Sequence, residues 1–553
     1  MVKSSKYILF LILAAFFFRG VFLVAVFPIF KGQDESRHYN TVQYLSTGKG
    51  VDYQNTTKDK DGKTIYENNQ QDKQDLSTYR YSDEIKKTAL ITQHKQVRGA
   101  YYDKVNFKQG VEGYGEVKFK DEQYSKIQHV YPPDVAGSSF GKDGFSLYQW
   151  SLSGVEKLLS PQNIFVRYSV LRIISVLLGV VLLLLAYNIF RGVQFTERQS
   201  LILTAIISFQ PKLVTYFTNI NYDVLLIPLW TGFIFLGTLI LKKGWNFSRA
   251  LVLVGLLAGA IMTKPSALPL LGLLVFLIGR VLYQKIKKQK FKSIHWIVIS
   301  LGMIVVTWTS YLLLKKVGLT SLFSERYLST LGDYLNASLS KIDGSSSDYW
   351  GAIRWQANNF TSIYVQIIWI IEWMAWSGIV FLITGTAFSK LFKETLAKLQ
   401  WKFFRKLVVG HHEEKGTSRG FLATIVTKIM RKSESYLRRL DKTIKQNNKQ
   451  RIYLWFMLAA IIVLQIGIRV ADWKVFMSEG NLALGTPGRY WLPNIIPHFV
   501  LLALGLKVVM AGFSKRKIMQ RRYFEWSLLG FLVLMMLYWT YEVVDIIIPR
   551  FYL

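Results

Sequence analysis

Apolar runs of about 20 residues recur along most of this 553-residue chain, and they constrain its fold more than any other feature. A run of this length is what an α-helix needs to cross the hydrocarbon core of a bilayer. Hydrophobic residues make up 51% of the chain and aromatic residues 15%, a composition that few soluble domains share. The chain is therefore predicted to be an all-α polytopic membrane protein with about 11 transmembrane helices.

The first of these helices is interpreted as an uncleaved signal anchor, because FPIFKG follows it rather than a cleavage site of small residues. The fifth and sixth helices meet at MTKPS, so they could form a broken or re-entrant pair. The predicted transmembrane helices cover residues 6–27, 165–190, 200–220, 223–241, 249–263, 266–283, 294–314, 361–386, 452–470, 489–510 and 524–547.

The chain divides into membrane-spanning parts and the loops between them. In order, the predicted parts are the first helix at 1–27, a large extracytoplasmic loop or small domain at 28–164, helices two to seven at 165–314, a second extracytoplasmic loop at 315–360, helix eight at 361–387, a basic cytoplasmic insert at 388–451, and helices nine to eleven at 452–553.

The formal net charge of +34 is unevenly distributed across the predicted membrane. If the N-terminus is cytoplasmic, Lys and Arg greatly outnumber Asp and Glu in the inner connections, whereas the outer segment 28–160 is nearly neutral. This distribution follows the positive-inside rule, so topology explains the charge and nucleic acid is not an expected partner. The basic, amphipathic insert at 388–451 is predicted to lie on anionic lipids of the cytoplasmic leaflet.

The stretch DESRH follows the first apolar run and places Asp34, Glu35 and His38 at the outer membrane surface. If residues 33–46 are helical, Asp34 and His38 are one turn apart and share a face. Such a group suits a general base, or Asp34 and Glu35 could hold a divalent cation such as Mg²⁺ or Mn²⁺. The alternative is an acidic cap at the N-terminus of an interfacial helix, which has no catalytic role.

Two further polar residues are predicted to lie on the same side, at the ends of helices. Lys264 stands in an otherwise apolar stretch, where a lysine is unfavourable unless it faces a cavity or pairs with an anion. Asp223 follows Asn219 and Asn221, and it could bind a sugar or a metal. The alternatives are a lysine that extends to the lipid headgroups and an aspartate that caps a helix.

Arg489 and Tyr490, in the stretch TPGRYWLP, begin the tenth predicted helix. The planar guanidinium group suits phosphate, and Gly485 and Gly488 would allow the backbone to come close to a ligand. These residue types are also common at membrane interfaces, so a purely anchoring role stays open. The chain has no cysteine and no motif for nucleotide binding or serine hydrolysis, which leaves thiol chemistry and ATP-driven transport without support.

These motifs resemble those of the GT-C superfamily, whose members are polytopic glycosyltransferases that use sugars linked to polyprenyl phosphate. The stretch DESRHY is similar to the first-loop acidic motif of protein mannosyltransferases and of lipid A aminoarabinose transferases. The chain also closely resembles a bacterial family of polytopic membrane proteins of unknown function that has a first-loop Asp-Glu motif. The motifs that carry the likeness are Pro28 with Asp34, Glu35 and His38, then Pro211 with Asn221 and Asp223, then Thr263 to Pro265, and then Gly488 to Tyr490 with Pro493.

The resemblance implies a division of roles among these residues. Asp34, with Glu35 assisting, would act as the catalytic base for an acceptor hydroxyl, or the two would bind a metal. Lys264 and Arg489 would neutralise the lipid phosphate and stabilise it as the leaving group. The residues assigned to substrate binding are His38, Asp223, Lys264, Arg489 and Tyr490.

The sequence therefore predicts a membrane glycosyltransferase that transfers a sugar from a polyprenyl-phosphate-linked donor to a cell-envelope glycan or lipid acceptor. The active site is expected on the extracytoplasmic face of a multi-pass protein in a bacterial plasma membrane. The alternatives are a polymerase or ligase of lipid-linked oligosaccharides and a transporter or flippase of lipid-linked saccharides. A transporter predicts symmetry-related halves with broken helices near the midplane, and the sequence shows no convincing internal repeat.

Overall fold

The computed structural model describes most of the predicted spanning helices and several of the segments that join them. The residues described are 3–30, 32, 34–46, 57–58, 64–65, 85, 88, 146–287, 330–339, 346, 348–351, 359–384, 450–479, 488–514 and 516–548. The predicted helix at 294–314 and nearly all of the predicted insert at 388–451 lie outside these residues, so both stay predictions.

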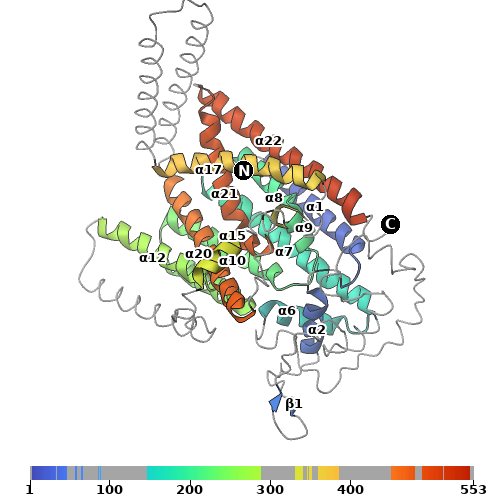
Figure 1. Ribbon diagram of the computed structural model, residues 1–553. Coiled ribbons are helices and arrows are strands. Elements are labelled where there is room, and N and C mark those ends of the chain that lie inside the picture. The colour runs from blue at the N-terminus through green and yellow to red at the C-terminus, as the bar shows by residue number, and fades with distance from the viewer. Residues whose placement is uncertain are drawn as a thin grey trace, which may run out of the picture.

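Eight helices within the described residues are long and apolar enough to cross a membrane (Figure 1). The prediction of an all-α polytopic membrane protein is therefore confirmed, whereas the number of about 11 spans stays a prediction. The long helices are α1 (Lys3–Val26), α7 (Ile164–Gly192), α10 (Asp223–Lys243), α12 (Leu270–Lys287) preceded by η2 (Pro265–Ala267), α17 (Asn359–Thr384), α20 (Arg451–Glu479), α21 (Ile495–Ala511) preceded by η5 (Gly488–Asn494), and α22 (Lys517–Tyr541) continued by η6 (Glu542–Ile547).

Shorter elements occur in the connections between the long helices. The helices α2 and α6 pack against each other at one end of the bundle (Figure 1). The two strands form a small antiparallel pair in which Thr57 is opposite Ile65. The shorter elements are α2 (Glu35–Ser46), β1 (Thr57–Lys58), β2 (Thr64–Ile65), α6 (Leu147–Leu158), α8 (Glu197–Ser208), α9 (Pro211–Tyr216), α11 (Phe247–Thr263) and α15 (Leu331–Leu339).

The predicted continuous helix at 200–220 consists of two helices in the structure. The first, α8, ends at Ser208, and α9 begins at Pro211. Proline has no N–H to donate to the preceding turn, and the side chain of Gln210 caps α9 by accepting a hydrogen bond from the N–H of Leu213. The prediction of one span was wrong here because it followed hydropathy and gave no weight to the proline.

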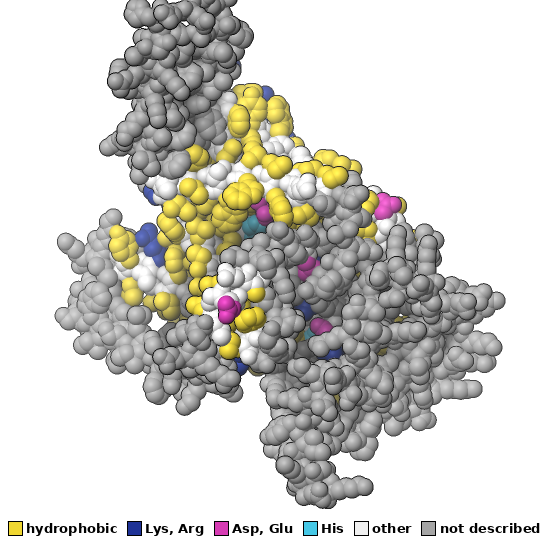
Figure 2. Space-filling view, in the orientation of Figure 1, with side chains coloured by type: hydrophobic (Ala, Val, Ile, Leu, Met, Phe, Trp, Pro, Cys, Tyr) yellow, Lys and Arg dark blue, Asp and Glu magenta, His cyan; other side chains and the backbone are white. Residues whose placement is uncertain are grey.

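Large hydrophobic side chains cover much of the outside of the bundle. Phe18 on α1 is 68% exposed and Trp373 on α17 is 77% exposed. Figure 2 shows hydrophobic side chains gathered over the upper part of the molecule, where α17, α21 and α22 lie. The most buried of the long helices are α10 and α21, which form the centre of the bundle. This inside-out distribution is what a lipid environment favours.

The helices α17 and α21 approach each other closely at small residues. A Cβ atom added to Gly505 would collide with the carbonyl oxygen of Ala375, and one added to Gly378 would collide with the carbonyl oxygen of Gly505. Glycine and alanine allow this approach between backbones, which is how membrane helices gain packing contact without a hydrophobic driving force.

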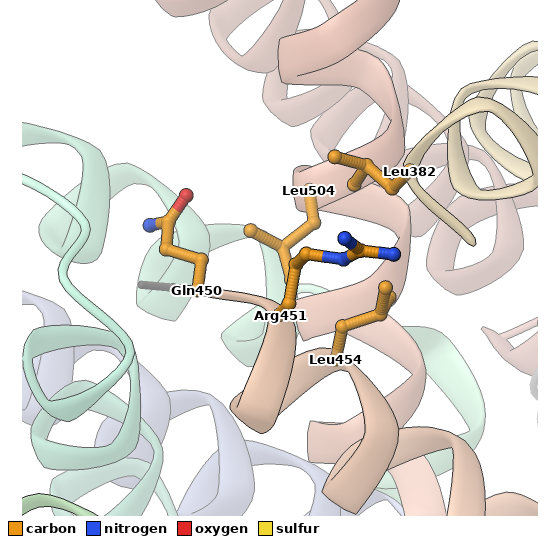
Figure 3. Close-up of a pocket in the computed structure, with 5 residues that line it drawn as sticks. All are labelled: Leu382, Gln450, Arg451, Leu454 and Leu504. Atoms are coloured by element: carbon orange, nitrogen blue, oxygen red, sulfur yellow. The ribbon is translucent and has the colours of Figure 1, made fainter. Parts of the chain in front are cut away.

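A small cavity lies between α17, α20 and α21 (Figure 3). Its volume is about 10 Å³, and its lining includes Arg451 and Gln450. A cavity of this size holds about one water molecule. It is too small for a sugar or a lipid phosphate, so the polar residues at the ends of the helices are the better candidates for a functional site.

The close contact at Gly505 predicts that Gly505→Ala destabilises the protein. The added methyl group meets the α17 backbone, and overpacking of this kind lowers the free energy of unfolding by about 1–3 kcal/mol. Gly530→Ala on α22 is the matched control, because a Cβ there has no atom within 4 Å. Thermal unfolding of both variants in detergent measures the difference, and equal melting temperatures would contradict the prediction.

Candidate active site

The carboxylate of Glu35, at the start of α2, is fully buried and accepts four hydrogen bonds. Arg172 on α7 donates two of them, from Nε to Oε1 at 2.8 Å and from Nη2 to Oε2 at 2.7 Å. The backbone N–H groups of Gly32 and Ile220 donate the others, at 2.8 and 2.9 Å. A bidentate pair of this kind fixes geometry, so Glu35 is a structural anchor of the site.

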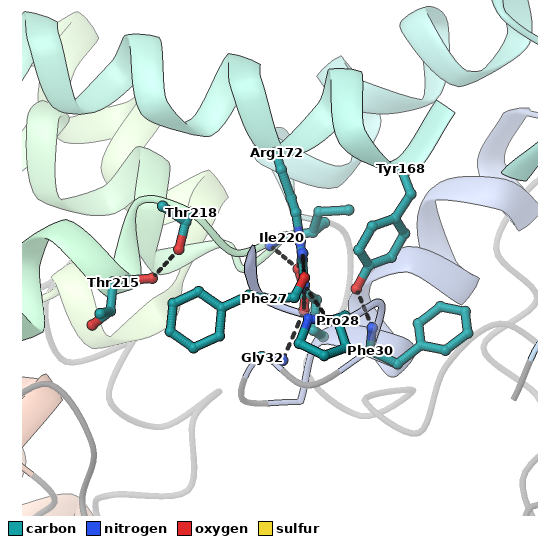
Figure 4. A network of polar contacts seen from close by, with 10 residues as sticks. Phe27, Pro28, Phe30, Gly32, Tyr168, Arg172, Thr215, Thr218 and Ile220 are labelled. Carbon is teal, nitrogen blue, oxygen red and sulfur yellow. Dashed lines mark hydrogen bonds and ion pairs between the residues drawn. The ribbon is translucent and has the colours of Figure 1, made fainter. Parts of the chain in front are cut away.

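Arg172 also fastens the end of α1 to α7. Its guanidinium group donates to the carbonyl oxygens of Phe27 at 2.6 Å and Pro28 at 3.0 Å (Figure 4). Beside it, the hydroxyl of Tyr168 accepts a hydrogen bond from the N–H of Phe30 at 3.1 Å. Arg172 was not among the predicted site residues, although it is a charged residue within an apolar span, as Lys264 is.

Asp223 and Lys264 form a second charged pair. Asp223 begins α10, and Lys264 stands in an extended conformation between α11 and η2. The ammonium nitrogen of Lys264 lies 2.8 and 3.0 Å from the two carboxylate oxygens of Asp223. The hydroxyl of Tyr216, at the end of α9, donates to the same carboxylate at 2.9 Å. The anion that the sequence requires for Lys264 is thus Asp223.

Arg489 and Tyr490 lie on η5, next to this pair. The Nη2 atom of Arg489 lies 3.2 Å from the hydroxyl oxygen of Tyr490, to which it donates. The cations of Arg489 and Lys264 each lie 5.0 Å from the centre of the Tyr490 ring. Tyr490 therefore connects the two cations through its π face, an arrangement that stabilises positive charge.

Arg489 retains hydrogen-bonding capacity that no described residue uses. Its side chain is only 11% exposed, yet Nε and Nη1 have no hydrogen-bond partner among the described residues. The indole N–H of Trp491 is buried and equally without a partner within the same part of the chain. Buried donors are nearly always satisfied in proteins, so these three donors are available to an acceptor outside the described residues.

The helix η5 is held in place by Asn494 at its end. The Oδ1 atom of Asn494 accepts a hydrogen bond from the indole of Trp230 on α10 at 3.0 Å. Its Nδ2 atom donates to the carbonyl oxygen of Ala460 on α20 at 2.7 Å. Because Asn494 is buried and satisfied on both sides, η5 has a fixed position relative to α10 and α20.

Asp34 completes the cluster from the other side. Its backbone has a φ of 54°, in the left-handed region that aspartate tolerates better than most residues. Its carboxylate lies 3.8 Å from Nη2 of Arg489. The Asp34 side chain is 36% exposed, against 0% for Glu35 and 7% for Asp223. Among these three carboxylates, Asp34 is the one that a substrate can reach.

His38 is buried beside the cluster on α2. Burial lowers the pKa of His38 to about 4, and nearby charges of both signs add smaller, opposing effects. The imidazole is therefore neutral at pH 7. Its Nδ1 atom lies 3.0 Å from the side-chain amide nitrogen of Gln149 on α6, which makes Nδ1 the acceptor. Its ring packs edge-on against Tyr222, with 4.5 Å between ring centres.

The residues predicted from the sequence therefore converge in space, although they come from distant parts of the chain. Further residues that the sequence analysis missed support the cluster, chiefly Arg172 and Tyr216. The predicted residues that meet here are Asp34, Glu35, His38, Asp223, Lys264, Arg489 and Tyr490.

The predicted metal pair of Asp34 and Glu35 does not fit this geometry. The two oxygens of Glu35 already accept four hydrogen bonds, two of them from Arg172. Within the described residues, no group of three or more His, Asp or Glu side chains is arranged to hold a metal ion.

The fold and this cluster define a polytopic membrane protein with a charged site at one end of its helices. Residues 147–310 match the family of dolichyl-phosphate-mannose-protein mannosyltransferases. This is a family of GT-C glycosyltransferases, so the resemblance to GT-C enzymes is confirmed, and the match supports a membrane glycosyltransferase that uses a lipid-linked donor. The match spans less than a third of the chain and includes Arg172, Asp223 and Lys264. No curated protein and no solved structure matches the chain.

The burial of Glu35 predicts that Glu35→Gln impairs folding. The variant leaves the charge of Arg172 buried without a counter-ion, which lowers the free energy of unfolding by about 3–5 kcal/mol. Asp34→Asn is the matched control, because Asp34 is next to Glu35 in sequence but its side chain is partly exposed and not buried. Thermal unfolding and the yield of monodisperse protein measure the effect. If Glu35→Gln melted at the temperature of Asp34→Asn, the anchoring role would be refuted.

Proposed function

We propose that the protein transfers a sugar from a polyprenyl-phosphate-linked donor to a cell-envelope glycan or lipid acceptor on the extracytoplasmic face of a bacterial plasma membrane. The observation that carries this proposal is the pair of buried donors Nε and Nη1 on Arg489, which have no partner among the described residues. The Nη2 atom of the same guanidinium group lies 3.8 Å from the exposed carboxylate of Asp34. A phosphate group would satisfy these donors, because a guanidinium group matches phosphate oxygens in bidentate geometry.

The charges of the cluster favour a monophosphate over a diphosphate donor. Asp223 accepts hydrogen bonds from Lys264, and Glu35 accepts them from Arg172. Of the cations Arg172, Lys264 and Arg489, it is Arg489 that has buried donors without a partner among the described residues. A phosphodiester brings one negative charge to this site, and a diphosphate brings two. Since an unbalanced charge is unfavourable in a partly buried site, the alternative of a diphosphate-linked oligosaccharide donor is less well supported.

Asp34 is proposed to act as the general base. The hydroxyl of the acceptor attacks the anomeric carbon of the sugar, and its proton passes to the carboxylate of Asp34. The bond between the anomeric carbon and the phosphate oxygen breaks, and the electron pair stays on the polyprenyl phosphate. The leaving group gains a second negative charge, which Arg489 stabilises. Attack from the side opposite the phosphate inverts the configuration at the anomeric carbon.

The other residues of the cluster are proposed to support these two. Glu35 fixes the backbone that carries Asp34, and the Asp223–Lys264 pair packs under the ring of Tyr490. His38, neutral and buried, holds α2 against α6 rather than contributing charge to a ligand. The position of the cluster at the ends of α10, α11 and η5, and not near the middle of the spans, favours a transferase over a transporter.

The assignment of Asp34 predicts that Asp34→Asn abolishes transfer without loss of the protein. Removal of a general base lowers the rate by about 10²- to 10⁴-fold. The measurement is the envelope glycan of a strain that depends on the variant, with the membrane level of the protein checked in parallel. Asp333→Asn, at an exposed position on α15, serves as the control. Unchanged glycosylation in the Asp34 variant would refute the role.

The assignment of Arg489 predicts that Arg489→Lys weakens binding of a lipid phosphate. Lysine cannot replace the donors Nε and Nη1 in their planar arrangement, so the affinity for farnesyl phosphate is expected to fall about 10- to 100-fold. Binding to purified protein in nanodiscs measures this, with farnesol as the uncharged ligand. Arg249→Lys, at the start of α11, is the control. Equal affinities of the Arg489 variant and the wild type would contradict the phosphate site.

A further inference from the structure

Glu372 is the one acidic residue in the described length of α17, and it lies in the middle of that membrane-spanning helix. Its carboxylate is 20% exposed, and its partner is His498 on α21, with 3.2 Å between Oε1 and Nε2. No lysine or arginine among the described residues lies within 4 Å of it. A carboxylate inside a span is unfavourable and marks function more often than packing.

His498 connects Glu372 to Tyr349. The Nδ1 atom of His498 lies 3.0 Å from the hydroxyl oxygen of Tyr349. In the neutral imidazole, Nε2–H donates to Glu372 and Nδ1 accepts from Tyr349. In the charged imidazole both nitrogens donate, and the tyrosine hydroxyl accepts from Nδ1. The chain of contacts from Glu372 to Tyr349 therefore persists in both charge states of the histidine.

Tyr349 belongs to a short segment that is tied to two helices. The carbonyl oxygen of Tyr349 accepts a hydrogen bond from the side-chain amide of Gln210, the residue that caps α9. The neighbouring Asp348 forms a buried ion pair with Lys212 on α9, at 2.7 Å. The segment is tied to α17 by Ser346, which accepts a hydrogen bond from Trp369 at 2.8 Å.

Tyr349 also contacts the part of the candidate site that carries Arg489. Its ring centre lies 5.8 Å from that of Trp491, two residues after Arg489 on η5. Through Gln210 it is tied to α9, whose last residue, Tyr216, donates to Asp223. Tyr349 thus lies between the segment with the unused donors and the helix that leads to the Asp223–Lys264 pair.

We propose that Glu372, His498 and Tyr349 form a hydrogen-bonded relay that positions Arg489 relative to the Asp223–Lys264 pair and so sets the affinity for the phosphate of the donor. This inference rests on the proposed function. The three are positioning residues, because they act through Trp491 and Gln210. The hydrogen bonds between Glu372, His498 and Tyr349 fix the orientation of these side chains and the distances between them. Apolar side chains of the same volume would not fix either.

The first experiment removes one hydroxyl group. Tyr349→Phe keeps the ring and its contact with Trp491 but loses the bond to His498, and its affinity for farnesyl phosphate is expected to fall about tenfold. Binding of farnesol should not change. Tyr364→Phe is the matched control, because it removes a buried hydroxyl on α17 that bonds to Met535 and not to the relay. This control should bind farnesyl phosphate as the wild type does.

A second pair of variants separates the relay from simple packing. His498→Gln can still donate to Glu372 and accept from Tyr349, so it should bind farnesyl phosphate more tightly than His498→Leu, which can do neither. In a double-mutant cycle, Tyr349→Phe should add little to the effect of Arg489→Lys, because both act on the same contact with phosphate. A general loss of packing would instead give additive effects.

Each outcome decides between the two proposals. If the wild type binds farnesyl phosphate no better than farnesol, the phosphate site is wrong and the relay falls with it. If the wild type prefers farnesyl phosphate and Arg489→Lys loses that preference, the phosphate site stands. In that case, three results would overturn the relay alone. The first is wild-type affinity of Tyr349→Phe for farnesyl phosphate, and the second is equal affinity of His498→Gln and His498→Leu. The third is an additive effect of Tyr349→Phe and Arg489→Lys on binding.

Discussion

The ion pair between Glu35 and Arg172 is the interaction on which the candidate site depends. Both side chains are buried, and neither charge is tolerable there without the other. The pair joins the end of α1, the start of α2, the face of α7 and the segment before α10. Asp34 directly precedes Glu35, so the anchored residue determines where the exposed one points. Adjacent carboxylates thus have different roles, one in structure and one, as proposed, in chemistry.

Compensation of charge explains most of the remaining cluster and makes Arg489 its exception. Asp223 is paired with Lys264 at 2.8 Å, whereas Asp34 lies 3.8 Å from Arg489. An unsatisfied buried donor is unfavourable by about 1–3 kcal/mol, and Arg489 has two of them among the described residues. A ligand that satisfies these donors recovers this free energy on binding. Binding of an anion would thus be favourable here, which is the property that the proposed phosphate-binding position requires.

The sequence was sufficient to predict several of the unusual residues, because a charge in an apolar run is unfavourable wherever the chain folds. Lys264 was predicted as a site residue for this reason, and Asp34 and Glu35 were predicted from the acidic motif. The pairing of Glu35 with Arg172 could not be predicted, since these residues are far apart in sequence and the pairing depends on how the segment between α1 and α2 lies against α7. The break at Pro211 was also missed, because hydropathy changes little there. The positive φ of Asp34 is set by tertiary contacts and has no signature in composition.

The directions of the helices add a long-range contribution to the site. Asp223 occupies the first turn of α10, and Arg489 lies on η5, which leads into α21. The N-terminal ends of two largely buried helices therefore face the cluster, and each carries a partial positive charge. In a membrane these partial charges are weakly screened, so they raise the local potential where the proposed phosphate would bind.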